Sequence, residues 1–426
     1  MDNMVLQKQE EFMEKFIGYQ CSICGKEFDA NYSGYTCDCC SGNLNVVLDY
    51  DGIRKFVKPE DIFSSNEKSL WRYLPLLPVE DPGFEGTALH SAGLTPVFKI
   101  DSVAKEKGVA NFWIKDEGRN PTASFKDRAS AILIARAKQI GMKTIATAST
   151  GNAGAALAGM AAASNWDAVI FAPKTAPKAK IAQLLIFGAH VILVDGNYDS
   201  AFDLSVEACE KYGWYCRNTG YNAFTAEGKK TAAFEIWEQI ISKSKSNKPL
   251  NIFVSVGDGN IISGIHKGFK DLYKLGWIEQ MPRIFGVQSE KSAAIYNAWA
   301  ANSEEIIPVT ATTIADSISV DLPRDGVRAV RAAKETGGAY IAVPDEDIYK
   351  GIAEIGKFGV FAEPAGATAF AGFKKAVATG LIGADDDVLV VNTGSGLKDV
   401  NSAMIAAGQA PVIEPTMVAL EKFLKV

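Results

Sequence analysis

The sequence predicts an α/β fold in which largely parallel sheets are covered by helices on both faces. Two observations support this prediction. From about residue 100 onward, short runs rich in β-branched residues alternate with longer helical patterns. The runs themselves are almost continuously apolar, for example NIFVSV at 251–256 and VLVV at 388–391, which is typical of strands buried on both faces of a sheet.

The individual elements follow in order along the chain. Residues 51–100 are expected to form a loop-rich connection, because prolines and glycines recur in them. A helix is expected from Lys126 through Ala137, after a polar Asn-Pro turn. Beyond it, strands are predicted at 143–148, 168–172, 191–194, 251–256, 283–287 and 388–391, and helices at 153–163, 176–187, 200–212 and 261–275.

Composition and charge exclude several classes of protein. The chain has 426 residues, of which 47% are hydrophobic and 22% charged, so it is an ordinary globular protein of two or three domains. Its net charge of −6 lacks the basic surplus of a nucleic-acid binder. No run approaches the roughly 18–20 apolar residues that cross a bilayer, and the first twenty residues contain no apolar signal core. A cytoplasmic protein without a membrane partner is expected.

Five of the seven cysteines lie between positions 21 and 40. Cys21, Cys24, Cys37 and Cys40 form two C-x2-C pairs, and Cys39 is a spare thiol inside the second pair. Four thiolates at this spacing match a tetrahedral structural zinc site, with no open position for catalysis. The alternative is a metal-free segment that keeps small thiols.

Two turns between a strand and a helix are candidate anion sites. The first is STGN at 149–152 and the second is GDGN at 257–260. Their glycines allow close approach of the backbone, and the first N–H groups of the following helix point at a bound group. A dinucleotide fingerprint fails, because its third glycine would fall on Ile262, and neither turn continues as a Walker A loop. The alternative is that both are tight turns without a ligand.

Lys126 is the candidate nucleophile. It lies at the start of the predicted helix, where the positive end of the helix dipole favours the neutral amine that a Schiff-base lysine needs. The residues by themselves leave open that Lys126 is a solvated lysine on a helix surface.

Residues 120–128, NPTASFKDR, resemble the pyridoxal-phosphate (PLP) lysine motif of threonine synthases, which belong to the fold type II, tryptophan-synthase-β-like PLP enzymes. The turn at 149–152 is similar to the asparagine loop of that family, 256–260 to its phosphate cup and 393–399 to its C-terminal cofactor loop. Segments 321–324 and 360–366 are similar as well. These matches occur in the order of the family and cover roughly residues 70–410.

The resemblance implies a two-lobed fold type II architecture. A zinc-ribbon-like segment would occupy residues 1–50, as in some threonine synthases, and the N-terminal part of the large catalytic domain, with the PLP-lysine motif, residues 51–142. A small α/β domain would follow at 143–220, and the remainder of the large PLP domain at 221–426. A homodimer is a candidate assembly.

The resemblance also implies roles for single residues. Lys126 would hold PLP through a Schiff base and move protons, Asn152 would hydrogen-bond the 3-hydroxyl of the cofactor, and Thr393 would contact its pyridine nitrogen. The cofactor phosphate would be cradled by Gly257, Asp258, Gly259 and Asn260, with Asp258 contributing its backbone N–H. The candidates for substrate binding are Lys115, Ser149, Thr150, Asn218 and Thr219.

The activity implied is the conversion of O-phosphohomoserine and water into threonine and phosphate. One departure concerns the arginine that clamps the substrate phosphate in the family, because its position falls on Thr225 or Phe224 here. Another cation, Lys115, Lys229 or Arg119, would have to replace it, or the amino-acid substrate differs. The alternatives are a sister fold type II enzyme (cysteate synthase-like β-replacement or serine/threonine dehydratase-like elimination), an NAD-linked oxidoreductase, and a zinc-ribbon adaptor without catalysis.

Overall fold

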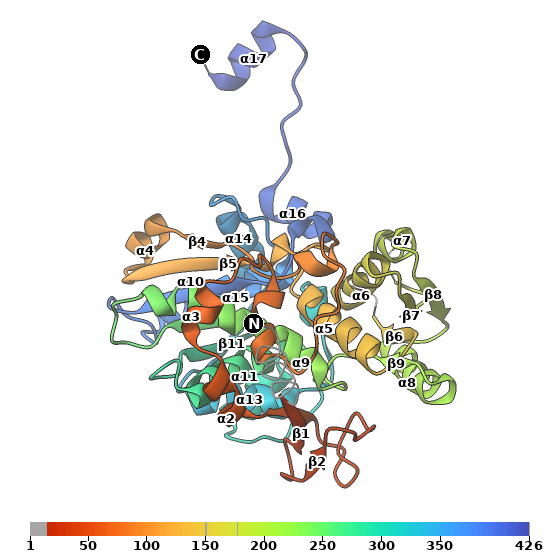
Figure 1. Cartoon of the computed structure of the whole chain (residues 1–426). Coiled ribbons are helices and arrows are strands. Elements are labelled where there is room, and N and C mark those ends of the chain that lie inside the picture. The colour runs from red at the N-terminus through yellow and green to blue at the C-terminus, as the bar shows by residue number, and fades with distance from the viewer. Residues whose placement is uncertain (1–14, 150, 177, 426) are drawn as a thin grey trace.

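The computed structural model describes residues 15–149, 151–176 and 178–425. These residues form three β-sheets with helices packed around them (Figure 1). A six-stranded sheet has the order β12-β11-β10-β13-β5-β4, a four-stranded sheet the order β8-β7-β6-β9 and a three-stranded sheet the order β2-β1-β3. The strands are β1 Phe16–Cys21, β2 Glu27–Asp29, β3 Leu44–Leu48, β4 Val97–Lys99, β5 Asn111–Asp116, β6 Thr144–Ala148, β7 Asp167–Pro173, β8 His190–Val194, β9 Tyr215–Cys216, β10 Asn251–Ser255, β11 Arg283–Ser289, β12 Tyr340–Val343 and β13 Asp387–Asn392.

The helices lie between these strands along the chain. They are α2 Tyr50–Phe56, α3 Pro59–Phe63, α4 Asp101–Lys107, α5 Lys126–Gln139, α6 Asn152–Ala163, α7 Lys178–Ile186, α8 Tyr198–Tyr212, α9 Phe224–Lys229, α10 Thr231–Gln239, α11 Asn260–Leu275, α12 Ala294–Ala300, α13 Gly326–Thr336, α14 Asp345–Gly356, α15 Pro364–Ala378, α16 Val400–Ala407 and α17 Met417–Leu424. Every strand and helix predicted from the sequence is present, with ends within two residues of the prediction. The strands β1 to β5, β9 and β12 and the helices α2 to α4, α9, α10 and α12 to α17 were not predicted.

The six-stranded sheet confirms the predicted parallel, doubly covered arrangement. All its neighbouring strands pair in parallel except β4, which pairs antiparallel with β5 at the edge. The central strands β10 and β13 are buried along their whole length. Successive side chains of β10 enter different cores: Ile252 and Val254 pack with α11 and α13, whereas Phe253 packs with α14 and α15.

The four-stranded sheet is entirely parallel and lies to the right in Figure 1. Its strands run from Thr144 to Cys216, within the range 143–220 predicted for a small domain. Ile145 and Ile170 pack on the side of α6 and α7, and Val169 and Phe171 on the side of α8. Cys209 and Cys216 are buried here, as free thiols.

The N-terminal sheet is a small antiparallel unit that lies against the catalytic body, at the bottom of Figure 1. Asn43 joins this unit to two distant loops, because its Nδ2 donates to the carbonyl oxygens of Gly220 at 2.5 Å and Arg324 at 3.2 Å. Tyr35 Oη accepts a hydrogen bond of 2.9 Å from the backbone N–H of Cys216. The N-terminal unit is therefore fixed to the loops that follow both larger sheets.

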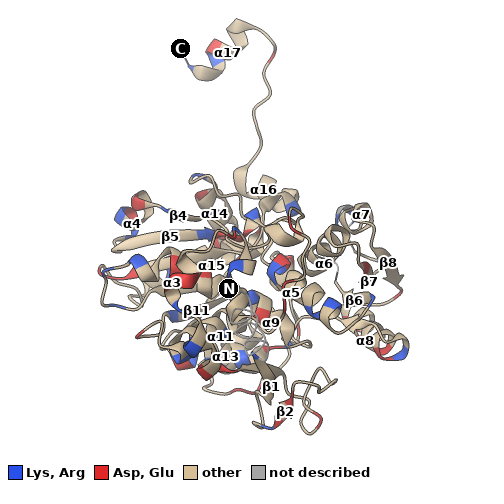
Figure 2. Cartoon of the chain, in the orientation of Figure 1, with Lys and Arg blue, Asp and Glu red and all other residues tan. Residues whose placement is uncertain are grey.

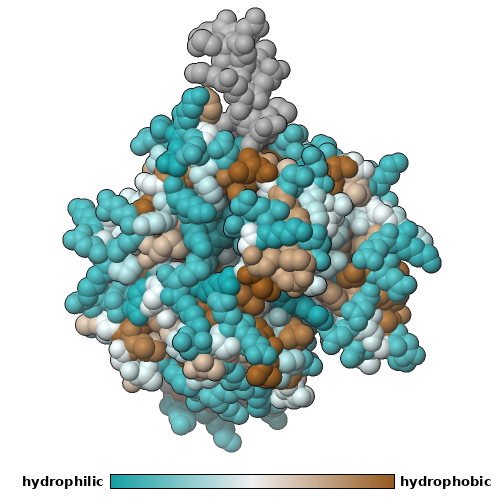
Figure 3. Space-filling view, turned by 90° about the horizontal axis from the view of Figure 1, so that it is seen from below, coloured by the Kyte–Doolittle hydropathy of each residue, from teal (hydrophilic) through white to brown (hydrophobic). Residues whose placement is uncertain are grey.

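The outside of the molecule is polar and mixed in charge. Basic and acidic residues are interspersed over the helices (Figure 2), and hydrophilic side chains cover most of the face in Figure 3, with scattered hydrophobic patches. At the top of Figure 1, far from the N-terminal sheet, α17 stands away from the body on an extended segment. Within the described residues, no helix combines the length and apolar character needed to cross a membrane.

Candidate active site

A cavity lies where turns from the two larger sheets meet. It brings together all seven predicted cofactor residues and Thr219. Its lining consists of Lys126, Asn152, Thr219, Lys229, Ser255, residues 256–262, Ser317, Ile318, Glu363, Ala365 and Thr393. Turns at the carboxyl ends of parallel strands are the usual ligand site of open α/β sheets. The position of the cavity therefore agrees with the sequence expectation for a ligand site.

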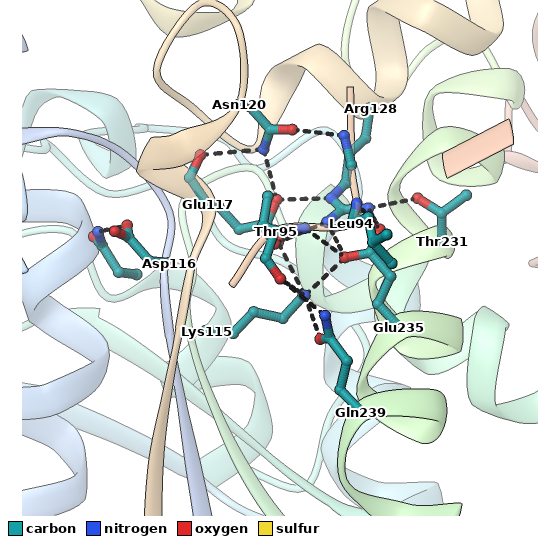
Figure 4. A network of polar contacts seen from close by, with 12 residues as sticks. Leu94, Thr95, Lys115, Asp116, Glu117, Asn120, Arg128, Thr231, Glu235 and Gln239 are labelled. Atoms are coloured by element: carbon teal, nitrogen blue, oxygen red, sulfur yellow. Dashed lines mark hydrogen bonds and ion pairs between the residues drawn. The ribbon is translucent and has the colours of Figure 1, made fainter. Parts of the chain in front are cut away.

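Three predicted substrate residues, Ser149, Asn218 and Lys115, do not line this cavity. Ser149 is buried and its Oγ accepts from the N–H of Gly151 at 3.2 Å. Asn218 is buried beside the end of β6, where its Oδ1 accepts from the N–H of Ala148 at 2.8 Å. Thr150 lies outside the described residues. Lys115 is fully buried in a separate polar network described in the Discussion (Figure 4).

Lys126 is the first residue of α5, and its side chain is half-buried at the cavity. Burial lowers the pKa of its amine, partly opposed by Asp258 and Glu363, and the positive charge of Arg217 lowers it further. These influences favour the neutral amine, which is the nucleophilic form of lysine. The structure thus gives Lys126 the electrostatic environment that an aldehyde-binding lysine requires.

The turn before Lys126 is fixed to the loop that carries Thr393. Phe125 donates its N–H to the carbonyl oxygen of Thr393 at 2.9 Å, and Ser395 donates to Ala123 at 3.0 Å. Ala123 has a positive φ of 63°, so this turn is held in a conformation that non-glycine residues seldom adopt. These bonds connect two motifs that lie far apart in the sequence, and they set the position of Lys126 relative to Thr393.

The turn at 257–260 has the geometry of an anion cup. Gly259, with φ of +90°, immediately precedes the sixteen-residue helix α11, whose first N–H groups can receive a phosphate. A Cβ at Gly257 would lie 2.8 Å from the Cα of Ile318, so only glycine fits there. The Asp258 carboxylate is turned toward the N–H of Arg324 at 3.4 Å, and burial raises its pKa. The Asp258 side chain therefore points toward Arg324, which agrees with the expectation that only the backbone N–H of Asp258 contacts the phosphate.

Lys229 supplies a positive charge beside this cup. Its Nζ donates to Asn260 Oδ1, and Asn260 Nδ2 donates to Asp325 at 2.7 Å. The amine is fully buried, which lowers its pKa well below the usual value, and the charges of Lys126 and Arg217 lower it further. Ser255 Oγ, also at the cavity, has no hydrogen-bond partner among the described residues. A phosphate in the cup would supply the missing acceptor and the missing negative charge, so the residues present fit a phosphorylated cofactor.

Glu363 is an active-site group that the sequence analysis did not identify. Its Oε1 accepts from Asn152 Nδ2 at 2.7 Å, and burial raises its pKa to about 7. At neutral pH this carboxyl therefore exchanges a proton readily. The segment 360–366 was recognised as a match, but a single glutamate before a helix carries no signal that it reaches a cavity.

A larger hollow adjoins the cavity and shares four lining residues with it, Asn152, Ser317, Glu363 and Ala365. It adds two basic side chains on its other walls. Lys180 is paired with Asp316, and Lys398 contacts Gln183 at 3.4 Å. This hollow is suited to serve as the entrance for a small polar molecule.

The four cysteines of the predicted zinc site lie together in the N-terminal unit, with all their sulfurs within 4.8 Å of one another. Cys21 Sγ is 3.5 Å from Cys40 Sγ, and Cys24 Sγ is 3.6 Å from Cys37 Sγ. Cys39 also lies close, 3.3 Å from Cys24. Four convergent thiols of this kind fit a tetrahedral metal ion.

Comparison with known proteins agrees with this geometry. The family model for the pyridoxal-phosphate dependent enzyme matches residues 89–394. The threonine synthase of Methanocaldococcus jannaschii is 36% identical, over 95% of this chain and 99% of the relative. That of Methanosarcina acetivorans is 34% identical, over 95% of this chain and 97% of the relative.

Solved structures share the fold. Processed threonine deaminase isoform 2 from Solanum lycopersicum superposes with a TM-score of 0.64 at 22% identity, covering 82% of this chain and 93% of that protein. Diaminopropionate ammonia lyase from Escherichia coli gives a TM-score of 0.63 at 22% identity, over 74% of this chain and 87% of that protein. Lys126, the anion cup and Thr393 lie around one cavity, as the sequence matches to these relatives lead one to expect. The chain belongs to the family of pyridoxal-phosphate dependent enzymes and, within it, to the threonine synthase family.

Proposed function

We propose that this protein is a threonine synthase that converts O-phosphohomoserine and water into threonine and phosphate. The observation that carries the proposal is the meeting of Lys126, the 257–260 turn and Thr393 at one cavity. An aldehyde needs an amine, a phosphate needs backbone N–H donors, and a ring nitrogen needs a polar partner, and the cavity offers all three. The names of the relatives that match nearly the whole chain support the same activity.

The residues of the cavity have separable tasks in this reaction. Lys126 would hold the cofactor aldehyde, the 257–260 turn with Lys229 its phosphate, and Thr393 its ring nitrogen. When bound, PLP supplies an electron sink for carbanions formed on the substrate. Thr393 offers only a neutral hydroxyl, which cannot hold the ring nitrogen protonated by an ion pair.

Proton transfer falls to the titratable groups at the cavity. Lys126 Nζ, whose pKa is lowered by burial, is suited to remove protons from the α- and β-carbons of the substrate and to return them. Glu363, whose pKa is raised to about 7, can hold or release a proton at neutral pH and so serve as a second acid or base. It also orients Asn152 through their 2.7 Å hydrogen bond. Water then adds at the β-carbon after phosphate has left the γ-carbon.

The test is a substrate screen on the purified full chain loaded with PLP. We expect O-phosphohomoserine to yield phosphate and threonine in equal amounts, measured together in one reaction. Serine and threonine, offered as substrates in parallel, are expected to give no ammonia or keto acid. A dehydratase would show the reverse pattern, and a β-replacement enzyme would release phosphate only from a different phosphorylated amino acid; either result would refute the proposal.

We also propose that the N-terminal unit binds one structural zinc ion through Cys21, Cys24, Cys37 and Cys40. Metal analysis of the full chain is expected to find one zinc per chain, and Cys24→Ser is expected to lose most of it. Cys39→Ser is the matched control and should keep the metal, because Cys39 is outside the predicted set. Wild-type protein without metal, or equal loss in both variants, would instead support a metal-free segment.

A cytoplasmic location, a homodimer and the domain boundaries given above stay predictions. The polar, charge-mixed exterior suits a protein that acts on a small amino-acid substrate, without nucleic acid or membrane as a partner (Figures 2 and 3). Size measurement of the full chain in solution would decide the assembly.

A further inference from the structure

Arg217 is a buried cation for which the protein offers no counter-charge in contact. It follows β9 and is fully buried. Its Nη1 donates to Thr219 Oγ1 at 2.7 Å and its Nε to Ser130 Oγ at 3.4 Å. Its Nη2 has no hydrogen-bond partner among the described residues, and in that part of the chain no carboxylate pairs with it. Enclosing an unpaired guanidinium costs several kcal/mol, so an absent anion is the simplest missing partner.

The other buried arginines among the described residues each form an ion pair with a carboxylate. Arg128 is paired with Glu117 and Glu235, Arg72 with Glu238, and Arg328 with Asp325. Each of these ion pairs is 2.5 to 2.7 Å long. Because the protein neutralises these arginines with its own carboxylates, the lack of such a partner at Arg217 is specific to that position.

The position of Arg217 connects it to the active site. Thr219, which accepts from its Nη1, lines the cavity. The positive charge of Arg217 also lowers the pKa of both Lys126 and Lys229. The pKa of Arg217 itself is lowered by burial to about 10, so it remains charged at neutral pH. Arg217 thus keeps its positive charge beside the cavity, whereas burial favours the neutral amine of Lys126.

The two larger sheets position different basic groups near this cavity. Lys229 and Asn260 lie beside the 257–260 cup, which follows β10 of the six-stranded sheet. Arg217 instead follows β9 of the four-stranded sheet, and its N–H bonds to the carbonyl oxygen of Ala146 in β6 at 2.8 Å. It therefore lies next to the end of β6, on the side of the 149–152 turn. The cofactor phosphate would thus be held by groups that follow the six-stranded sheet, and an anion at Arg217 by groups that follow the four-stranded sheet.

We propose that Arg217, together with Thr219, binds the phosphate group of the substrate in place of the arginine expected near Thr225. This inference rests on the proposed function, because it requires a phosphorylated substrate. A phosphate that replaces Thr219 Oγ1 as the acceptor of Nη1 would receive Nη1–H and Nη2–H together, the bidentate pattern that arginine forms with phosphate.

The other candidates for this task are already engaged. Thr225 is fully buried, and its hydroxyl donates to the carbonyl oxygen of Asn222 at 2.7 Å. Lys115 is held by Glu235, and Arg119 pairs with Asp116 at 3.1 Å. Lys180, in the adjoining hollow, is paired with Asp316. Lys229 is bonded to Asn260 beside the cofactor cup, and Lys398 lies in the adjoining hollow, 3.4 Å from Gln183. Arg217 differs from these basic groups because its Nη2 has no hydrogen-bond partner among the described residues.

The experiment uses the full chain loaded with PLP, so that the cofactor phosphate site is filled and added inorganic phosphate reports the second site. We expect Arg217→Gln to keep the near-visible cofactor absorption but to weaken phosphate binding, measured by calorimetry, by about tenfold to a hundredfold. The KM for O-phosphohomoserine should rise by a similar factor, and Arg217→Lys should be intermediate. Arg283→Gln is the matched control, because Arg283 bonds to Gly337 and Asn251, stacks over the Phe285 ring and does not line the cavity.

The outcomes separate this proposal from the proposed function. A folded, loaded Arg217→Gln protein whose phosphate affinity and KM stay within twofold of wild type would overturn the role of Arg217, even if threonine is formed. Loss of phosphate binding in Arg217→Gln, with a wild type that does not turn over O-phosphohomoserine, would support the anion site and refute the named substrate. If Arg217→Gln does not fold, a crystal structure of the wild-type holoenzyme with inorganic phosphate decides: the ion on Arg217 supports the proposal, and the ion on Lys180 and Lys398 overturns it.

Discussion

Replacing Lys126 with alanine is expected to remove the near-visible absorption of the purified protein and to reduce threonine formation by about 10⁴-fold or more. Lys126 is the lysine of the segment that resembles the PLP-lysine motif, and it lines the cavity. It lies at the start of α5, beside the anion cup. Without it, the aldehyde of the cofactor has no covalent attachment, and the proposed base for the α- and β-protons is lost as well. Absorption spectra and a coupled phosphate assay measure the two losses.

The control for this prediction is Lys105→Ala. Lys105 is an exposed lysine of α4, far from the cavity lining, so this variant should keep both the absorption and the activity. Reduction of the wild type with borohydride, followed by peptide mass analysis, should place the cofactor mass on the peptide that contains Lys126. Retained absorption in Lys126→Ala, or the added mass on another peptide, would contradict the assignment.

The parts of the site that could be predicted from the sequence are those built from local motifs. The 257–260 turn and Thr393 follow predicted strands, and Lys126 begins a predicted helix. The contact of Thr393 with the cofactor was implied by the family resemblance alone. The same local rule placed the strands β6, β7, β8, β10, β11 and β13 and the helices α5 to α8 and α11. It did not reveal β5 or β12, which lack a long β-branched run and pair with strands far away in the sequence, nor the short edge strand β4, which pairs with β5.

What the sequence could not show depends on contacts between distant residues. Arg217 stands out because no carboxylate among the described residues pairs with it. Glu363 stands out because burial raises its pKa to about 7. Neither feature is visible until the fold is known. Lys115 shows the opposite case: a basic residue at the end of a strand was a reasonable substrate ligand, but Glu235, 120 positions later, holds it in the interior.

A buried charge network is centred on Arg128, in the first turn of the active-site helix α5 (Figure 4). The Arg128 guanidinium donates to Glu117 at 2.7 and 2.8 Å and to Glu235 at 2.5 and 2.7 Å. Lys115 Nζ donates to Glu235 at 2.7 Å and to Gln239 at 3.0 Å. The side chains of Arg128, Lys115, Glu117 and Glu235 are fully buried, so their two positive and two negative charges balance inside the protein.

Glu235 is the acidic member of this network that forms hydrogen bonds with both Arg128 and Lys115. Besides Arg128 and Lys115, it accepts from the backbone N–H groups of Leu94 at 2.7 Å and Thr95 at 3.1 Å. Arg128 and Lys115 hold the pKa of Glu235 down at about 2 despite its burial. Its negative charge therefore neutralises two cations and also anchors the loop before β4.

Replacing Glu235 with alanine is expected to lower the free energy of unfolding by about 3–5 kcal/mol, because it leaves two buried cations with one carboxylate. Urea unfolding of the cofactor-free protein measures the change as a lower midpoint at an unchanged slope. The control is Glu335→Ala, since Glu335 is 42% exposed and pairs with Lys270, and that change should cost no more than about 1 kcal/mol. A loss no larger than that of the control would show that the network does not stabilise the fold. Because none of its charged residues lines the cavity, the Glu235→Ala protein that remains folded at low temperature should still bind PLP, which separates this effect on stability from the chemistry of Lys126.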